Sequence, residues 1–255
     1  MADDLTLTRD GLVAVLEIRR PPANYFDRTL IGLLAEAADE LDEDKDCRAI
    51  VLCSEGKHFC AGANFGGDEM GGDRIATSEA LYRHAVRLFR IKVPVIAAVQ
   101  GSAVGGGLGL ACAADFRVAS PSSRFHANFS LLGFHQGFGL SVTLPEIVGQ
   151  QRAMDMLFAS RRISGERAAE IGLVDRLVPD DAQRDEAMRW AQEIADAAPL
   201  AVRSIKQTLR GDLADRVSAA LDRELSEQAW LWSTKDSAAG IAANLERRKA
   251  VFSAH

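Results

Sequence analysis

A glycine run behind a buried apolar strand constrains this chain more than any other feature. Residues 93–119 read VPVIAAVQGSAVGGGLGLACAADFRVA, in which Gly105, Gly106 and Gly107 open a segment of helical character. Glycines let a ligand come within hydrogen-bonding distance of backbone N–H groups. The first turn of a helix adds unpaired N–H donors and the positive end of the helix dipole. The segment therefore predicts a site that holds negative charge.

Composition limits the partners and the compartment. The net charge of −6 over 255 residues argues against a nucleic-acid-binding surface. No run of about 18 apolar residues is present, so we expect no membrane span. The acidic start, MADDLTLTRDG, is neither a secretory signal nor an organelle transit peptide. The four cysteines form no CxxC pair, and we expect them to be reduced thiols in or near the core of a cytoplasmic protein.

The first two thirds of the chain alternate between strand and helix patterns. Apolar runs predict strands at residues 12–18, 49–53, 93–99 and 116–118. Apolar residues at helical spacing predict helices at residues 28–42, 78–91 and 108–114. Residues 55–72 carry six glycines and predict a loop. This order indicates an α/β fold with layered helices and parallel strand pairing.

The last third is expected to be helical. The patterns predict helices at residues 166–171, 183–197, 200–211, 213–233 and 237–252, and at most one strand, at 173–178. All three tryptophans, Trp190, Trp230 and Trp232, fall in this part. They belong either to the core of this subunit or to a contact with a partner subunit.

Several familiar catalytic motifs are absent from the sequence. The glycines of residues 105–109 are spaced GxGxG rather than the GxGxxG of a dinucleotide site, and residues 56–57 lack the spacing of a phosphate-binding loop. No HExxH motif is present, and residues 139–143 fail the GxSxG pattern. We therefore expect no bound metal, no nicotinamide cofactor and no serine nucleophile.

Two segments of small residues remain as candidate binding sites. Residues 59–64, FCAGAN, follow the strand predicted at 49–53, and residues 105–107 follow the strand predicted at 93–99. In a parallel sheet, ligands bind beyond the carboxyl ends of the strands. Two converging N–H groups would form an oxyanion hole for a carbonyl oxygen that becomes anionic. The alternative is a pair of tight turns that hold no ligand.

These segments resemble the crotonase superfamily, also called the enoyl-CoA hydratase/isomerase family. The resemblance spans nearly the whole chain. It includes Arg20-Pro21 with Asn24, FCAGAN at 59–64, the glycine segment with Asp115 behind it, GERAAEIGLV at 165–174 and ERRKAVF at 246–252. The glycine segment joined to FCAGAN is specific for this family.

The resemblance implies a fold, a substrate and an assembly. The fold is a spiral of ββα units over residues 1–195 that holds the acyl-CoA site, followed by a C-terminal helical region over residues 196–255 used in trimerisation. Homotrimers in this family often pair into hexamers. The substrate is an acyl-CoA thioester, so coenzyme A arrives as part of the substrate and no separate cofactor is implied.

The resemblance also assigns residues to the site. The two oxyanion donors fall on the N–H groups of Ala63 and Gly106, where the thioester oxygen of an enolate would lie. Ala61, Asn64 and Gly105 flank these donors and are expected to contact the substrate.

The family pattern breaks at two positions. Family hydratases carry two glutamates that handle the attacking water and its protons, and these positions fall on Gly109 and Phe129. Neither side chain can transfer protons. We therefore do not expect direct hydration by the family's usual mechanism.

The segment LGFHQGFG at residues 132–139 offers the best local replacement. By resemblance it lines the acyl pocket, and His135 has a pKa suited to proton transfer near neutral pH. The alternative is a histidine that hydrogen-bonds within a turn. Gln136 either orients a water or an acyl oxygen, or is a loop amide. Phe134 and Phe138, with Phe129, predict a pocket for a bulky hydrophobic or aromatic acyl group, or else belong to the core.

Other groups are further alternatives. If the segment leading to Phe129 is extended, His126 and Asn128 point to one face and Phe129 to the other. Tyr82 is expected to pack in the core or an interface unless it serves as an acid. The acidic residues of the glycine-rich loop are either solvated or carried over the site by the loop: Asp68, Glu69 and Asp73.

The phosphates of coenzyme A need cationic partners. Arg247, Arg248 and Lys249 either supply them, to the site of this subunit or of a neighbouring one, or form a solvated basic helix end. We expect Lys249 to contact the substrate.

Together these features predict an acyl-CoA-processing enzyme that passes through a thioester enolate. The open alternatives are an isomerase, decarboxylase or hydrolase that uses His135, and a relative that binds acyl-CoA without turnover. RNA binding, known within the superfamily, is disfavoured by the acidic composition and by the absence of a lysine-rich helix face.

Overall fold

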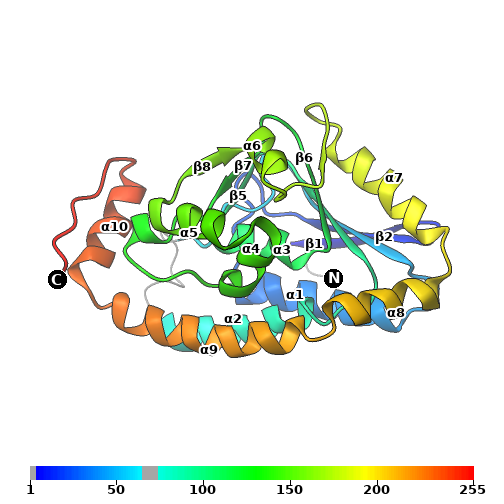
Figure 1. Cartoon of the computed structure of the whole chain (residues 1–255), viewed down its shortest axis with the longest axis horizontal. Helices are drawn as coiled ribbons and strands as arrows, with labels where there is room; N and C mark the ends of the chain where they lie inside the picture. Colours follow the sequence, from blue (N-terminus) through cyan, green and yellow to red (C-terminus); the bar gives the residue numbers. More distant parts are fainter. Residues whose placement is uncertain (1–3, 65–73) are drawn as a thin grey trace.

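The main sheet of the molecule is largely parallel, as the alternation of strands and helices predicts. The computed structural model describes residues 4–64 and 74–255 (Figure 1). In this part six strands pair in the order β1-β2-β3-β4-β6-β9. They are β1 (Leu5–Asp10), β2 (Val13–Ile18), β3 (Ala49–Ser54), β4 (Val95–Val99), β6 (Phe116–Ala119) and β9 (Arg176–Leu177). Only the β1–β2 pair is antiparallel. The α/β class is thereby confirmed.

Helices cover both faces of this sheet. Every residue of β3 and β4 is buried, which is typical of parallel strands that are covered on both sides. Helix α7 (Gln183–Ala195) packs Ala187, Ala191 and Ala195 on one face. On the other face lie α1 (Arg28–Glu43), α2 (Arg74–Leu88) and α3 (Gly106–Ala113), whose apolar residues join the larger core. The expected helices at 28–42, 78–91 and 108–114 are confirmed within a few residues.

A second, three-stranded sheet stands beside the glycine turn, and the sequence patterns did not predict it. Its strands are β5 (Ser102–Val104), β7 (Arg124–His126) and β8 (Arg162–Ser164). Strands of three residues are too short to show a period of two, so sequence periodicity passes over them. The short 3-10 helix η2 (Ser130–Leu132) follows β7.

The remaining helices confirm the helical last third, with shifted ends. They are α4 (Leu140–Val148), α5 (Gln150–Ala159), α6 (Gly165–Glu170), α8 (Pro199–Arg210), α9 (Leu213–Leu231) and α10 (Lys235–Leu245). Helices α4 and α5 were not predicted. The expected helix at 237–252 is wrong beyond residue 245, since the chain after α10 carries no regular structure.

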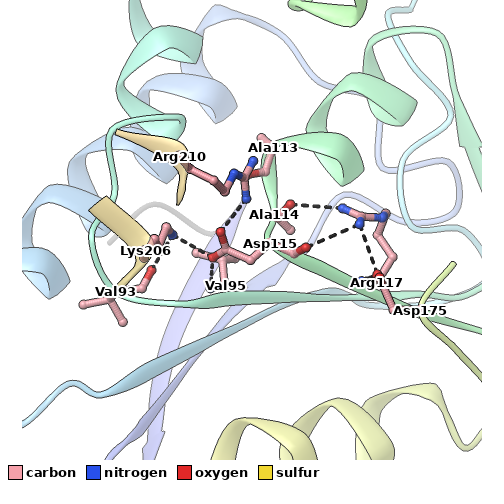
Figure 2. A network of polar contacts seen from close by, with 9 residues as sticks. All are labelled: Val93, Val95, Ala113, Ala114, Asp115, Arg117, Asp175, Lys206 and Arg210. Carbon is pink, nitrogen blue, oxygen red and sulfur yellow. Dashed lines mark hydrogen bonds and ion pairs between the residues drawn. The ribbon is translucent and has the colours of Figure 1, made fainter. Parts of the chain in front are cut away.

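Helix α8 is tied to the sheet by a buried carboxylate behind the glycine segment (Figure 2). Asp115 accepts a hydrogen bond from the backbone N–H of Val95 at 2.8 Å. It also pairs with Lys206 at 2.6 Å and with Arg210, both from α8. Burial alone would raise the pKa of Asp115, but the two cations outweigh it and the pKa is lowered. The carboxylate therefore stays charged and holds α8 against β4.

The cysteines are all enclosed, whereas the tryptophans differ in burial. All four cysteines are buried and unpaired, as expected, and burial raises the pKa of Cys60 to about 12. The Trp190 ring lies 4.3 Å from the Phe116 ring, and Trp232 packs against the larger core, whereas Trp230 is 56% exposed.

No helix in the described part of the chain combines the length and apolar character that a membrane crossing requires.

Candidate active site

A cavity of about 540 Å³ opens where the two small-residue segments meet. It is lined by residues of the 61–64 segment, the 104–106 turn, the 128–138 segment, the start of α1, helix α2 and the end of α9. Both segments follow strands whose carboxyl ends lie at one edge of the parallel sheet, namely β3 and β4. The cavity therefore lies where the sequence predicted a ligand.

Backbone pairing holds the two segments against each other. Cys60 and Ala103 form an isolated parallel bridge. The Cys60 N–H donates to Ser102 O at 3.0 Å, and the Val104 N–H donates to Cys60 O at 3.0 Å. The FCAGAN segment is thus fixed to β5, which leads directly into the glycine turn.

Phe26 connects the two expected oxyanion donors. A second parallel bridge joins Phe26 to Ala63, and the Phe26 N–H donates to Gly62 O at 3.1 Å. The Phe26 ring lies so close to Gly106 that a Cβ on that glycine would overlap it. One side chain therefore packs against the backbone of both segments.

The N–H groups of Ala63 and Gly106 are available to a ligand. Gly106 is the first residue of α3, where backbone N–H groups have no partner within the helix. Gly105 precedes it at φ +55°, a conformation that glycine adopts without strain, and provides no side-chain cap. Across the described residues, neither Ala63 nor Gly106 donates its N–H to another residue, and both line the cavity. Such a pair can bind one anionic oxygen.

Aromatic packing fills the first of the two positions where hydratase glutamates would stand. Gly109 is fully enclosed within α3, and a Cβ added there would lie 2.6 Å from the Cβ of Phe138. Phe138 packs in turn on Phe26, with ring centroids 5.7 Å apart. The space beside Gly109 therefore belongs to Phe138.

Two rows of rings lead away from the oxyanion donors. On one side Phe129 lies beside Gly105, its ring 6.1 Å from Phe134, which lies 6.0 Å from Trp232. On the other side are Phe26 and Phe138. All five rings line the cavity. The expected aromatic pocket of Phe129, Phe134 and Phe138 is thus assembled, and Phe26 and Trp232 add two rings that were not expected in it.

A neutral polar pair interrupts this aromatic lining. The Tyr82 hydroxyl donates to Gln228 Oε1 at 3.0 Å, and Gln228 Nε2 donates to His135 O at 3.1 Å and Gln136 O at 3.2 Å. Burial, together with the nearby charge of Glu224, raises the pKa of Tyr82. The phenol therefore remains protonated and can act as a donor but not as a base at neutral pH.

His135 and Gln136 do not line the cavity, although their loop does. His135 Nδ1 is 2.9 Å from Gln136 O, the turn-type contact that was its alternative reading. The Gln136 amide donates to Ser141 Oγ at 3.0 Å. Neither side chain is brought to the oxyanion donors, so catalysis by His135 and substrate binding by Gln136 remain predictions without geometric support.

The segment leading to Phe129 is not extended, so the condition under which Asn128 and Phe129 were expected on opposite faces does not hold. Extended structure ends with β7 at His126, and Phe129 has helical dihedral angles, φ −63° and ψ −45°, as it enters η2. Strict alternation therefore stops, and Asn128 and Phe129 both line the cavity. His126 does not; its Nε2 is 2.8 Å from Ser160 O.

Charged groups occur in the lining around Arg20. This guanidinium pairs with Asp4 at 2.7 Å and with Asp27 at 2.5 Å, and Arg28 lies nearby with its side chain exposed.

Ala61 and Asn64 line the cavity as expected. Lys249 is exposed on the C-terminal segment and does not, so its contact with substrate remains a prediction. The acidic candidates Asp68, Glu69 and Asp73 lie outside the described residues.

Sequence reasoning missed several cavity residues, among them Phe26, Gln228 and Trp232. Gln228 and Trp232 come from the end of α9, more than 120 residues after the glycine turn, and no local pattern tells which face of that helix meets the cavity. Phe26 follows the Arg20-Pro21 and Asn24 positions of the family resemblance, which is the one signal that could have drawn attention to it.

Comparison with known proteins identifies the family of the chain. The family described as Enoyl-CoA hydratase/isomerase matches residues 8–255. The chain is 31% identical over 253 residues to the short-chain-enoyl-CoA hydratase of Clostridium acetobutylicum, covering 97% of this chain and 96% of that protein. It is 30% identical over 254 residues to the crotonyl-CoA hydratase of Syntrophomonas wolfei, covering 98% of each.

Solved structures show the same fold. An enoyl-CoA hydratase/isomerase from Pseudoalteromonas atlantica superposes with a TM-score of 0.88 at 29% identity, covering 98% of this chain and all of that one. An enoyl-CoA hydratase from Mycobacterium avium subsp. paratuberculosis gives a TM-score of 0.86 at 27% identity, covering 98% of each chain. The fold expected from the sequence resemblance is confirmed.

Proposed function

Because the chain belongs to the enoyl-CoA hydratase/isomerase family, which acts on acyl-CoA, we propose that it converts an acyl-CoA thioester through an enolate. The enolate oxygen would lie between the N–H groups of Ala63 and Gly106. Fixed backbone dipoles stabilise charge that develops in a transition state without reorganising, and removing one such donor typically costs about 10²–10³ in rate.

One observation carries this proposal: two residues that line the same cavity have backbone N–H groups that no described residue accepts. Two unrelated turns would have no reason to leave both donors unpaired at one concave surface. Phe26 supports this, since it packs on both donor segments and fixes them relative to each other.

The lining does not support hydration by a pair of glutamates. The first glutamate position is occupied by Gly109 against Phe138, and the second carries the Phe129 ring. The carboxylates that do line the described part of the cavity, Asp4 and Asp27, are paired with Arg20. The proposal therefore favours an isomerase, decarboxylase or hydrolase in which the proton moves through a neutral donor, water or the substrate.

Hydrogen exchange at the α carbon tests the enolate directly. The protein is incubated in heavy water with a panel of saturated, enoyl- and β-oxoacyl-CoA thioesters, and mass spectrometry follows deuterium at the α carbon. We expect at least one thioester to exchange faster than without protein. The exchange should fall about 10²–10³-fold in Ala63→Pro, because proline deletes an N–H that no described residue accepts.

Thermal unfolding of Ala63→Pro is the control for its fold. Exchange that proceeds equally in a folded Ala63→Pro protein would refute the role of this donor. If no thioester exchanges or turns over, the proposed reaction is wrong.

Binding of acyl-CoA without turnover is the second candidate. It is favoured by the absence of an unpaired carboxylate or an imidazole among the described residues that line the cavity. Calorimetry that detects tight acyl-CoA binding in a protein that shows neither exchange nor turnover would select it.

Self-association through the C-terminal helices is also proposed. Helix α8 reaches the body of the subunit through Arg203, Lys206 and other basic residues, and none of its residues is buried. Its Leu200 is 82% exposed and its Leu209 75% exposed. A homotrimer or a hexamer would cover such a surface. Light scattering after gel filtration should give three or six subunits, and a monomer would contradict this.

We further propose that turnover needs no metal or separate cofactor. Among the described residues, no group of three or more His, Cys, Asp or Glu side chains is placed to hold a metal ion. The buried, unpaired thiols support the earlier assignment to a reducing compartment such as the cytoplasm.

A further inference from the structure

Asn128 has a polar side chain in the cavity for which the enolate proposal has no use. The residue is half-buried and lines the cavity, and its carboxamide makes no hydrogen bond with any described residue. Some side-chain polar atoms that lack a partner are fully buried, but those of Asn128 are not among them. The Asn128 amide is therefore open to the cavity. An amide offers two N–H donors and one acceptor oxygen.

The backbone on both sides holds Asn128 in place. Ala127 O accepts a hydrogen bond from Ser160 Oγ at 2.9 Å, and Asn128 O accepts from the Leu132 N–H at 3.2 Å. The first bond ties the end of β7 to the α5 terminus, and the second closes the turn into η2. The amide is therefore presented by a fixed segment, which reduces the entropy lost when it binds a ligand.

The amide lies beside the oxyanion donors. Asn128 Oδ1 is 3.1 Å from the place where a Cβ on Gly105 would stand, and Gly105 immediately precedes the donor Gly106. An acyl group whose thioester oxygen occupies the oxyanion site would have its next carbons within reach of this amide. Asn128 thus faces the part of the substrate that carries the α and β carbons.

The surroundings favour a neutral oxygen as the partner of this amide. Its neighbour Phe129 and the rings beyond it are apolar, and the arginine that is half-buried in the lining, Arg20, is paired with Asp4 and Asp27. A carboxylate bound only by a neutral amide among aromatic rings would be poorly solvated. A ketone oxygen costs far less to bury and accepts the same hydrogen bond.

The lack of a free base points to the position of that oxygen. Enolate formation without a strong base is easiest when a second carbonyl group acidifies the α carbon. Resting on the proposed enolate function, we propose that Asn128 binds the β-carbonyl oxygen of a β-oxoacyl thioester. The α proton passes to water, and the electron pair of the broken C–H bond becomes enolate charge shared between two oxygens, one held by Ala63 and Gly106 and the other by the Asn128 amide.

A matched pair of thioesters tests this assignment. The probes are 3-oxo-3-phenylpropanoyl-CoA and 3-phenylpropanoyl-CoA, which differ only in the β oxygen, and binding is followed by quenching of tryptophan fluorescence, since Trp232 lines the cavity. We expect the wild-type protein to bind the oxo thioester about tenfold to a hundredfold more tightly, as a hydrogen bond with charged character allows. A near-ultraviolet difference spectrum should show the enolate.

In Asn128→Leu, leucine has nearly the same shape as asparagine but carries no polar side-chain atoms. Asn128→Ala is a second variant in case the leucine fits badly. Both should reduce the preference to less than about twofold and abolish the enolate band, with the affinity for 3-phenylpropanoyl-CoA unchanged. Asn244→Leu, the same change on the exposed end of α10, should keep the preference.

Each result decides between the two proposals. If the wild-type protein binds both thioesters equally, or if folded Asn128 variants keep the preference, the role of Asn128 is overturned while acyl-CoA binding stands. If neither thioester binds, the acyl-CoA function itself is overturned, and the role of Asn128 with it.

Discussion

A single methyl group at Gly109 tests whether Phe138 fills the space beside this glycine, where the family resemblance places a hydratase glutamate. A Cβ there would lie 2.6 Å from the Phe138 Cβ, 2.9 Å from its Cδ1 and 3.0 Å from its Cγ. Carbon atoms pack at about 3.5–4.0 Å. The backbone of α3 or the segment that carries Phe138 must therefore move to admit an alanine.

Two effects of opposite sign determine how Gly109→Ala changes the free energy of unfolding. In a helix interior, alanine is favoured over glycine by about 0.8–1 kcal/mol. Adding atoms to a well-packed core typically costs about 1–3 kcal/mol. The added methyl group would overlap three atoms of the buried Phe138 side chain, which places the cost near the upper end of that range. We expect Gly109→Ala to lower the free energy of unfolding by about 1–2 kcal/mol, where helix propensity alone would raise it.

Phe138→Gly provides the matched background. Phe138 has φ +59°, which suits glycine, so this substitution removes the ring and the Cβ while the backbone keeps its conformation. In that background Gly109→Ala meets no side chain and should raise the free energy of unfolding by up to about 1 kcal/mol. The coupling energy in a double-mutant cycle should therefore reach about 2–3 kcal/mol.

Urea unfolding of the four proteins measures this cycle. The expected pattern is a loss of stability on Gly109→Ala in the wild type and a gain in the Phe138→Gly protein. Stabilisation in both, or a coupling energy below about 0.5 kcal/mol, would refute the idea that Phe138 fills the space beside Gly109.

Four further outcomes are expected. Asp115→Asn leaves two cations of α8 without their buried carboxylate and should cost about 3 kcal/mol in urea unfolding; an unchanged unfolding midpoint would contradict the network in Figure 2. Because the folded pKa of Asp115 is lowered from 3.8, its contribution to stability is complete above about pH 4 and is lost as the pH falls further, so acid unfolding should be less steep in Asp115→Asn. Cys60, with a pKa of about 12, should react with a thiol reagent at pH 8 only after unfolding, and rapid labelling of folded protein would show that it is accessible. Prolonged dialysis against a chelator should leave α-carbon exchange unchanged, whereas a loss restored by one divalent ion would reveal a metal site.

The parts of the fold that sequence could predict are those with strong local patterns. β3 and β4 are apolar throughout because both of their faces are covered, and the stripe of α1 is regular, so these elements are evident in the sequence. β5, β7 and β8 have three residues each and owe their pairing to segments elsewhere in the chain. No window of sequence contains the information that makes them strands.

In the candidate site, too, some features could be predicted from local sequence and others could not. That Ala63 and Gly106 line the cavity could be predicted, because their placement depends on local turns of small residues. Side-chain roles could not, since they depend on rotation about a few bonds: Asn128 reaches the cavity because the chain turns into η2, and His135 instead contacts the carbonyl of its own loop. Gln228 enters the site only through the packing of α9.

Rings in place of carboxylates change which substrates the oxyanion donors can serve. N–H donors stabilise negative charge whatever its source, whereas a glutamate decides where a proton goes. Phe138 lies beside Gly109 and the Phe129 ring lines the cavity, so neither position supplies a charged group to hold a water for addition, and an apolar lining would strengthen the attraction between the proposed donors and an enolate. The same backbone site therefore favours substrates whose own carbonyl groups make the enolate accessible, and Asn128 is the lining side chain placed to select them.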